Sequence, residues 1–193
     1  MVAYLAALEL RDEGEEVRLL ALFDSPAPPD GSPPPEDYNN SELLGVFARF
    51  LGARCGKELP QPDGEFAGLD FEGRLHWALE TARRAEAVPP DSGLSQIRYL
   101  YQVYKNGLVS SVRQLWTVEP HPYPGRITLF RTRETLSAFE AIFPDATERW
   151  AALFSGEPLE VHRVAGDHYT MFLEPYGEEL GATLRRCLAA AGD

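Results

Sequence analysis

The sequence has few of the residues that would suit it to a membrane, to nucleic acid or to a metal cluster. No apolar run approaches the roughly 18 residues of a membrane-spanning helix, and the first residues lack a signal-peptide pattern. The 18 basic residues are outnumbered by 30 acidic ones, and this net charge of -12 argues against binding to phosphate backbones. The two cysteines, Cys55 and Cys187, have no metal-binding or redox spacing. We therefore expect a soluble, cytoplasmic protein with two free thiols and neither a membrane nor a nucleic-acid partner.

What the sequence does contain is the composition of one globular domain. Its 193 residues are 44% hydrophobic and 25% charged, and this length suffices to bury a sizeable core. Strands are predicted at residues 17–23, 126–131 and 159–164, and the first is almost continuously apolar, as buried parallel strands are. Helices are predicted at residues 1–11 and at about 176–190. Along the second helix, an apolar stripe that packs into the core is predicted, formed by Leu173, Tyr176, Leu180, Leu184 and Leu188. The order of these elements predicts an α/β fold with about three parallel strands and flanking helices.

A helical insertion is predicted between the first two strands, from about residue 33 to residue 120. It follows a run of three prolines and carries helical patterns at residues 41–51, 71–87 and 94–117, with a loop at residues 60–68. An insertion of this kind in an α/β domain most often forms a lid over the active site. Its last helix is rich in aromatic side chains, which either pack between helices or line a channel for a long substrate. These side chains are Tyr99, Tyr101, Tyr104 and Trp116.

Asp24 and His168 are the two candidate catalytic residues. Asp24 directly follows the first strand, and catalytic groups in open α/β sheets lie at the carboxyl ends of strands. The alternative is an Asp that only stabilises a turn. His168 lies in the stretch Gly166-Asp167-His168-Tyr169-Thr170-Met171, between the last strand and the last helix. α/β-hydrolases keep their catalytic base on such a loop. The alternative for His168 is a hydrogen-bonded structural histidine.

With these pieces in order, the chain resembles the C-terminal two thirds of a type I thioesterase domain, which is an α/β-hydrolase. Such domains release products from nonribosomal peptide synthetases and polyketide synthases. The resemblance covers nearly the whole chain and is most specific at its two ends. It rests on Met1-Val2-Ala3-Tyr4, on Leu22-Phe23-Asp24-Ser25, on residues 126–130, on Trp150, and on residues 164–171 with Glu174-Pro175.

The resemblance implies a reaction and its partners. In that family a Ser on a G-x-S-x-G elbow attacks the thioester on the phosphopantetheine arm of a carrier protein. Water or an internal nucleophile of the product then resolves the acyl-enzyme. His168 would be the general base, and Asp24 would orient its imidazole and stabilise the charged form. The implied partners are an acyl or peptidyl carrier protein and a small acyl or peptidyl substrate, and no cofactor is implied.

The chain departs from that family in having no G-x-S-x-G. The resemblance places this elbow directly before the helix that begins at Met1, so we expect a single truncated domain, residues 1–193, that is inactive alone. The oxyanion-hole donors would be missing too. Ser25, beside Asp24, is a poor substitute for the nucleophile. One alternative is a catalytically dead fragment that acts at most as a carrier-binding module, and another is a different hydrolase chemistry such as that of an esterase or peptidase.

No metal site is predicted. His162 and His168 are six positions apart on either side of a turn, which is unlike the spacing of metal ligands on a helix. His76 falls in a predicted helix and His121 lies between prolines, so we expect both to be structural or exposed.

Overall fold

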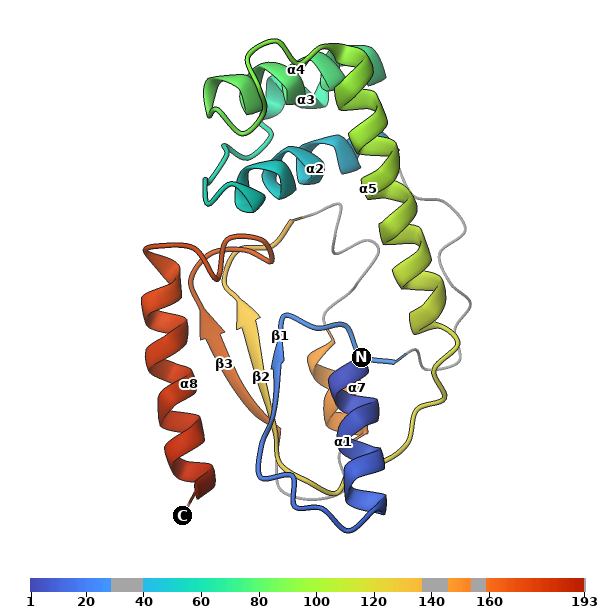
Figure 1. Ribbon diagram of the computed structural model, residues 1–193, viewed down its shortest axis with the longest axis vertical. Coiled ribbons are helices and arrows are strands. Elements are labelled where there is room, and N and C mark those ends of the chain that lie inside the picture. The colour runs from blue at the N-terminus through green and yellow to red at the C-terminus, as the bar shows by residue number, and fades with distance from the viewer. Residues whose placement is uncertain (29–39, 137–145, 154–158, 193) are drawn as a thin grey trace. The chain divides into compact units, whose positions relative to one another are not determined.

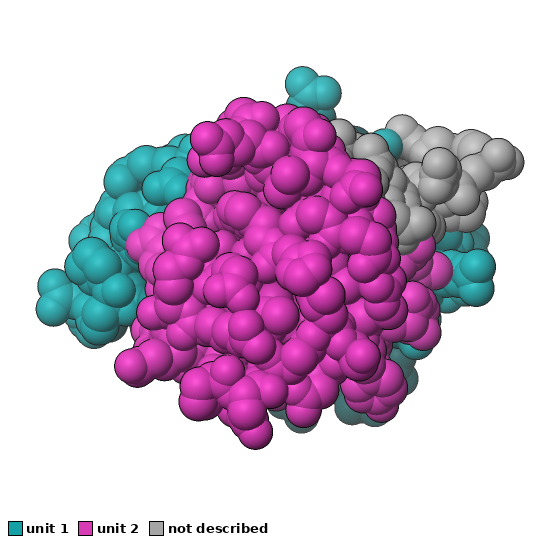
Figure 2. Space-filling view, turned by 90° about the horizontal axis from the view of Figure 1, so that it is seen from above, with its two compact units in different colours: residues 1–34, 113–135, 143–193 teal, residues 35–112, 136–142 magenta. Residues whose placement is uncertain are grey.

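The computed structural model describes residues 1–28, 40–136, 146–153 and 159–192 (Figure 1). The chain divides into two compact units, coloured teal and magenta in Figure 2. Unit 1 comprises residues 1–34, 113–135 and 143–193, and unit 2 comprises residues 35–112 and 136–142.

Unit 1 contains a parallel sheet of three strands. The strands are β1 (Leu20–Phe23), β2 (Ile127–Thr132) and β3 (Glu160–Val164), in the order β1-β2-β3. All six residues of the central strand β2 are buried, because a strand with neighbours on both sides and covered faces has little contact with solvent. The predicted fold class, with three parallel strands, is confirmed.

The first strand is shorter than predicted. It begins at Leu20 rather than at Val17, and Leu20 pairs with Ile127, the first residue of β2. The Leu20 N–H donates to the Arg126 carbonyl, and this is the hydrogen bond nearest to the N-terminal end of the β1–β2 pair among the described residues. Residues 17–19 therefore have no strand partner among the described residues, although Val17 still packs against the core. The other two strands begin within one residue of the predicted positions.

Three helices of unit 1 cover the sheet: α1 (Val2–Asp12), α7 (Thr147–Ala152) and α8 (Tyr176–Gly192). Side chains on alternate positions of the strands enter two separate core clusters, as the two-residue period of a strand requires. One cluster joins Leu20 and Leu129 to α1 and α7, and the other joins Phe130 to α8. Figure 1 shows α8 on one side of the sheet and α1 and α7 on the other.

The apolar face of α8 differs from the prediction in its last turn. We expect Leu180, Leu184 and Leu188 to form a buried stripe, yet Leu188 is exposed and Cys187 is buried in its place. The helix packs with the face that carries Leu180 and Cys187, and residue 188 lies a further 100° around the axis.

Unit 2 is helical. It contains α2 (Asn40–Arg54), α3 (Gly64–Ala67), α4 (Phe71–Arg84) and most of α5 (Leu94–Leu115). The three long helices were predicted, but α3 falls in a segment predicted to be a loop. Asp63 begins α3 by accepting hydrogen bonds from two backbone N–H groups of its first turn. None of the described helices is long and apolar enough to cross a membrane.

Two of the aromatic side chains of α5, Tyr101 and Tyr104, pack between helices, whereas Tyr99 is exposed. Tyr101 contacts Phe47 of α2 and Phe71 of α4, with ring centroids 5.5 and 6.0 Å apart. Tyr104 contacts Phe47 and Phe50 of α2. These contacts account for Tyr101 and Tyr104 without a substrate channel. That the segment from about residue 33 to residue 120 is a lid covering the His168 loop stays a prediction.

Candidate active site

Asp24 stands where strand β1 turns into a loop. Its backbone N–H donates to the Phe130 carbonyl at 2.7 Å, which extends the β1–β2 ladder by one bond. Its φ of 43° lies in the left-handed region, which Asp adopts more readily than most residues. This turn at the carboxyl end of β1 directs the carboxylate toward the ends of the neighbouring strands.

The Asp24 carboxylate meets His168 across 144 residues of sequence. His168 Nδ1 lies 3.1 Å from Asp24 Oδ2. The Asp24 side chain is 8% exposed and the His168 side chain 31% exposed, so the acid is enclosed while the imidazole reaches solvent. The two predicted residues are thus within hydrogen-bonding distance at the carboxyl ends of β1 and β3, and their catalytic role stays a prediction.

The other oxygen of Asp24 is held by strand β2. Asp24 Oδ1 accepts a hydrogen bond from Arg131 Nη1 at 2.8 Å, and weaker ones from the backbone N–H and the hydroxyl of Thr132 at 3.4 Å. Burial raises the pKa of Asp24, but the hydrogen bond with His168 and the positive charge of Arg131 outweigh it and lower the pKa below its ordinary value. Asp24 is therefore a carboxylate at neutral pH and accepts hydrogen bonds through both oxygens.

Arg131 is a site residue that sequence reasoning missed. The sequence places it at the end of the predicted strand at residues 126–131 and predicts no role for it. A signal was present, because a charged residue in an otherwise apolar, buried strand needs an oppositely charged partner.

The His168 loop is fixed by two neighbours. Gly166 has a φ of 82°, and a Cβ at this position would lie 2.9 Å from Thr170 Oγ1. Asp167 is fully buried, and its Oδ1 accepts hydrogen bonds from the N–H groups of Tyr169 and Thr170 and from the Thr170 hydroxyl. These contacts wrap the backbone around the Asp167 carboxylate and set the position of His168.

Ser25 links the loop after β1 to α7. Its hydroxyl donates to the Phe23 carbonyl at 3.1 Å, and its own carbonyl accepts from Trp150 Nε1 at 3.0 Å. That Ser25 is a poor substitute for the nucleophile stays a prediction.

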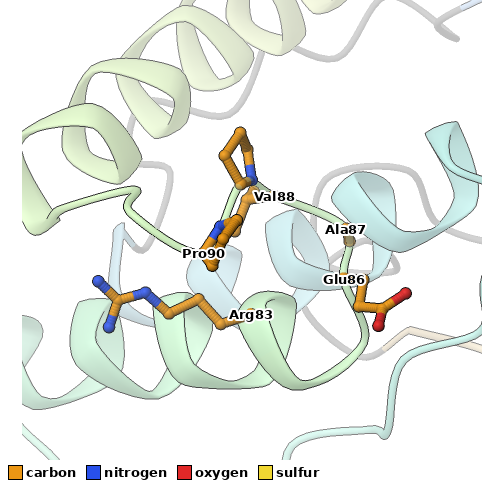
Figure 3. Close-up of a pocket in the computed structure, with 6 residues that line it drawn as sticks. Arg83, Glu86, Ala87, Val88 and Pro90 are labelled. Atoms are coloured by element: carbon orange, nitrogen blue, oxygen red, sulfur yellow. The ribbon is translucent and has the colours of Figure 1, made fainter.

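A surface hollow of about 520 Å³ lies in unit 2, at the end of α4 (Figure 3). Its charged side chains point apart and are engaged by neighbours: Glu86 pairs with Lys57 at 3.3 Å, and Arg83 pairs with Glu80 at 2.8 Å. We therefore assign it no ligand. It is lined by Arg83, Glu86, Ala87, Val88, Pro89 and Pro90.

Comparison with known proteins supports the resemblance. No family model matches the chain. Chondramide synthase cmdD of Chondromyces crocatus is 27% identical over 189 residues, which are 96% of this chain and 5% of that protein. The structure of holo-AB3403, a four-domain nonribosomal peptide synthetase, matches with a TM-score of 0.53 and 23% identity over 96% of this chain and 13% of its own.

The match to a solved thioesterase domain shows how much of that domain's fold this chain spans. The Vlm2 thioesterase domain, bound with a tetradepsipeptide, matches with a TM-score of 0.50 and 17% identity. The match covers 95% of this chain and 61% of that domain's chain, so the present chain spans less than two thirds of the solved domain. The chain is therefore similar over nearly its whole length to a segment of chondramide synthase cmdD, and its fold resembles part of the folds of holo-AB3403 and of the Vlm2 thioesterase domain.

Proposed function

We propose that the chain supplies the acid and the base of a thioesterase that releases an acyl or peptidyl chain from a carrier protein. The observation that carries the proposal is the hydrogen bond between Asp24 and His168 at the carboxyl ends of β1 and β3. The substrate is a thioester on the phosphopantetheine arm of the carrier. The nucleophile is a Ser on a segment outside residues 1–193, because these residues contain no G-x-S-x-G.

His168 moves the protons of both half-reactions. With Nδ1–H donating to Asp24, Nε2 takes the proton of the Ser hydroxyl while the Ser oxygen attacks the thioester carbonyl. The carbon–sulfur bond breaks, and His168 returns the proton to the departing phosphopantetheine thiol. Nε2 then takes a proton from water, or from a hydroxyl or amine of the product, as this group attacks the acyl-enzyme carbonyl. The bond to the Ser oxygen breaks, and His168 returns the proton to that oxygen, which restores the Ser hydroxyl and the neutral imidazole.

Asp24 orients His168 and fixes its tautomer, and Arg131 keeps Asp24 ionised. Asp24 holds the imidazole in the tautomer that leaves the basic lone pair on Nε2, and its negative charge stabilises the imidazolium that forms. Arg131, 2.8 Å from the other Asp24 oxygen, keeps the carboxylate ionised despite its burial. Arg131 acts through Asp24, so we class it as a positioning residue.

The test uses a protein extended by the residues encoded in frame upstream of Met1. An upstream G-x-S-x-G would supply the nucleophile, and hydrolysis of an acyl thioester of N-acetylcysteamine would be followed. We expect Asp24→Asn to lower kcat by about 10⁴-fold, as the loss of the corresponding acid does in serine proteases, and His168→Ala to lower it at least as much. The matched control is His76→Ala on the exposed surface of α4, which should leave kcat unchanged. Full activity of the His168→Ala variant would refute the assignment.

A second candidate is a catalytically inactive module that binds a carrier protein. The absence of G-x-S-x-G from all 193 residues favours it. A stop codon close upstream of Met1, together with calorimetric binding of a phosphopantetheinylated carrier protein that His168→Ala does not weaken, would select this reading.

A further inference from the structure

Three side chains with metal-binding donor atoms converge between strand β3 and helix α8, and none of them belongs to the Asp24–His168 pair. Glu160 and His162 are two positions apart on β3, so their side chains lie on the same face of the sheet. Helix α8 packs on that face and contributes Cys187, which is 3% exposed. Figure 1 shows α8 running alongside β3.

The three donor atoms are close enough to share one ion. His162 Nε2 lies 2.8 Å from Glu160 Oε1 and 3.3 Å from Cys187 Sγ. The carboxylate oxygen, the imidazole nitrogen and the sulfur all lie within 4.8 Å of one another. Tetrahedral zinc, with bonds of about 2.0–2.3 Å, holds its ligand atoms about 3.3–3.7 Å apart, so small side-chain rotations suffice to accommodate it.

One atom joins the three side chains. Nε2 of His162 lies within hydrogen-bonding distance of both the Glu160 carboxylate and the Cys187 sulfur. A protonated Nε2 donates to the carboxylate, and an unprotonated Nε2 accepts from the thiol, so hydrogen bonds use one of the two contacts at a time. A cation would bind all three donor atoms at once.

The carboxylate is already oriented for such a role. Glu160 Oε2 accepts hydrogen bonds from Arg126 Nη2 at 2.9 Å and from Thr128 Oγ1 at 3.1 Å. These bonds keep Oε2 engaged and turn Oε1 toward His162. Metal ligands are commonly oriented by outer hydrogen bonds of this kind. Glu160 and His162 are each about one third exposed, so an ion and a water molecule can reach the cluster from solvent.

We propose that Glu160, His162 and Cys187 bind a Zn²⁺ ion, with water in the fourth position. Zinc accepts carboxylate, imidazole and thiolate ligands together, whereas a thiolate ligand disfavours Mg²⁺ and Ca²⁺. The carboxylate and the thiolate balance the charge of the ion, and the Cys187 proton is released when zinc binds. The ion links β3 to α8 within unit 1. This inference is independent of the proposed thioesterase activity, because it uses different residues.

The test is a Co²⁺ titration of the chain after treatment with a chelator, followed by displacement with Zn²⁺. We expect one ion per chain, a thiolate-to-cobalt charge-transfer absorption, and bleaching of that absorption by zinc. Cys187→Ser should abolish the absorption. The two partly exposed ligands give second variants, His162→Gln and Glu160→Gln, which should each weaken Zn²⁺ binding by tenfold or more. The matched control is Cys55→Ser, the exposed cysteine of unit 2, which should bind both ions as the unaltered chain does.

Two results would overturn the proposal. One is a chain that binds no Co²⁺ or Zn²⁺ in this titration, which would leave a hydrogen-bonded cluster only. The other is a thiolate-to-cobalt absorption that disappears with Cys55→Ser and persists with Cys187→Ser. His162→Gln and Glu160→Gln keep the proposal testable if Cys187→Ser fails to fold, since unchanged binding in both of these variants would also contradict it.

Discussion

Replacement of Arg131 by Met tests the buried ion pair between Arg131 and Asp24 in the candidate site. Arg131 Nη1 lies 2.8 Å from Asp24 Oδ1, and the two side chains are 10% and 8% exposed. Methionine keeps the unbranched apolar part of the side chain and removes the charge. The variant therefore leaves a buried carboxylate with His168 and Thr132 as its remaining partners in the site.

The expected loss of stability is large. At this separation two unit charges attract by about 6 kcal/mol with an effective dielectric constant near 20. The cost of removing both charges from water offsets most of this attraction, but removing only one partner of a buried pair typically costs about 3–5 kcal/mol. Because His168 and Thr132 still contact the carboxylate, we expect a loss of about 3 kcal/mol at neutral pH, at the lower end of that range.

The loss should depend on pH in a definite direction. The pKa of Asp24 is lower in the folded protein than its ordinary value of 3.8. The ionised carboxylate therefore stabilises the fold fully above that ordinary value, and this contribution disappears as the pH falls through the lower pKa of the folded state. As the pH falls toward the lowered pKa of Asp24, the carboxylate becomes neutral in both proteins, so the difference between the unaltered chain and the Arg131→Met variant should be full at neutral pH and shrink in acid.

The assay is urea unfolding followed by tryptophan fluorescence in a Trp77→Phe background. The remaining tryptophans, Trp116 and Trp150, both lie in unit 1, so the signal follows the unit that holds the site. The matched control is Arg133→Met, because Arg133 pairs with Glu179 on the surface. An exposed pair contributes only about 0–1 kcal/mol. Equal losses for the two variants, or a loss for Arg131→Met that does not change with pH, would refute the reasoning.

Two further substitutions probe the His168 loop. Gly166→Ala forces an L residue into a φ of 82° and brings a Cβ to 2.9 Å from Thr170 Oγ1, so thermal unfolding should show a loss of more than about 1 kcal/mol. Asp167→Ala leaves buried donors of the loop without their acceptor and should cost about 1–3 kcal/mol, whereas Asp167→Asn retains an acceptor oxygen and should cost less. Faster amide exchange at residues 169–171 in the Ala variant alone would locate the effect in the loop, and equal exchange in both Asp167 variants would contradict it.

The two candidate residues at the carboxyl ends of β1 and β3 could be predicted from the sequence. Asp24 could be proposed because it directly follows an apolar strand, and His168 because it lies on the loop between the last strand and the last helix. The carboxyl ends of parallel strands lie along one edge of the sheet. The short helix α3 was missed because only the hydrogen bonds of Asp63 mark its start in a segment rich in proline and glycine.

Contacts between elements could not be derived in the same way. Arg131 reaches Asp24 across 107 residues, and its role depends on β2 lying beside β1. Cys187 reaches His162 only because α8 presents the face with Cys187, and not the one with Leu188, to the sheet. A rotation of α8 by one residue would separate the two, and hydrophobic periodicity does not fix rotation that finely. Judged by spacing in the sequence alone, the only pair of histidines considered for a metal site was His162 and His168, and Cys187 was not considered.

Most of unit 2 is inserted, in sequence, between β1 and β2, and this has a consequence for how the protein folds. The parallel pairing of Leu20 with Ile127 closes a loop that contains nearly all of the helical unit. The entropy of closing a loop grows only with the logarithm of its length, so doubling the insertion costs about 0.6 kcal/mol. Folding rate responds differently, because pairing between residues distant in sequence slows folding. During synthesis β1 emerges long before its neighbour, so changes in the length of the insertion should alter how fast the sheet forms far more than how stable it is once formed.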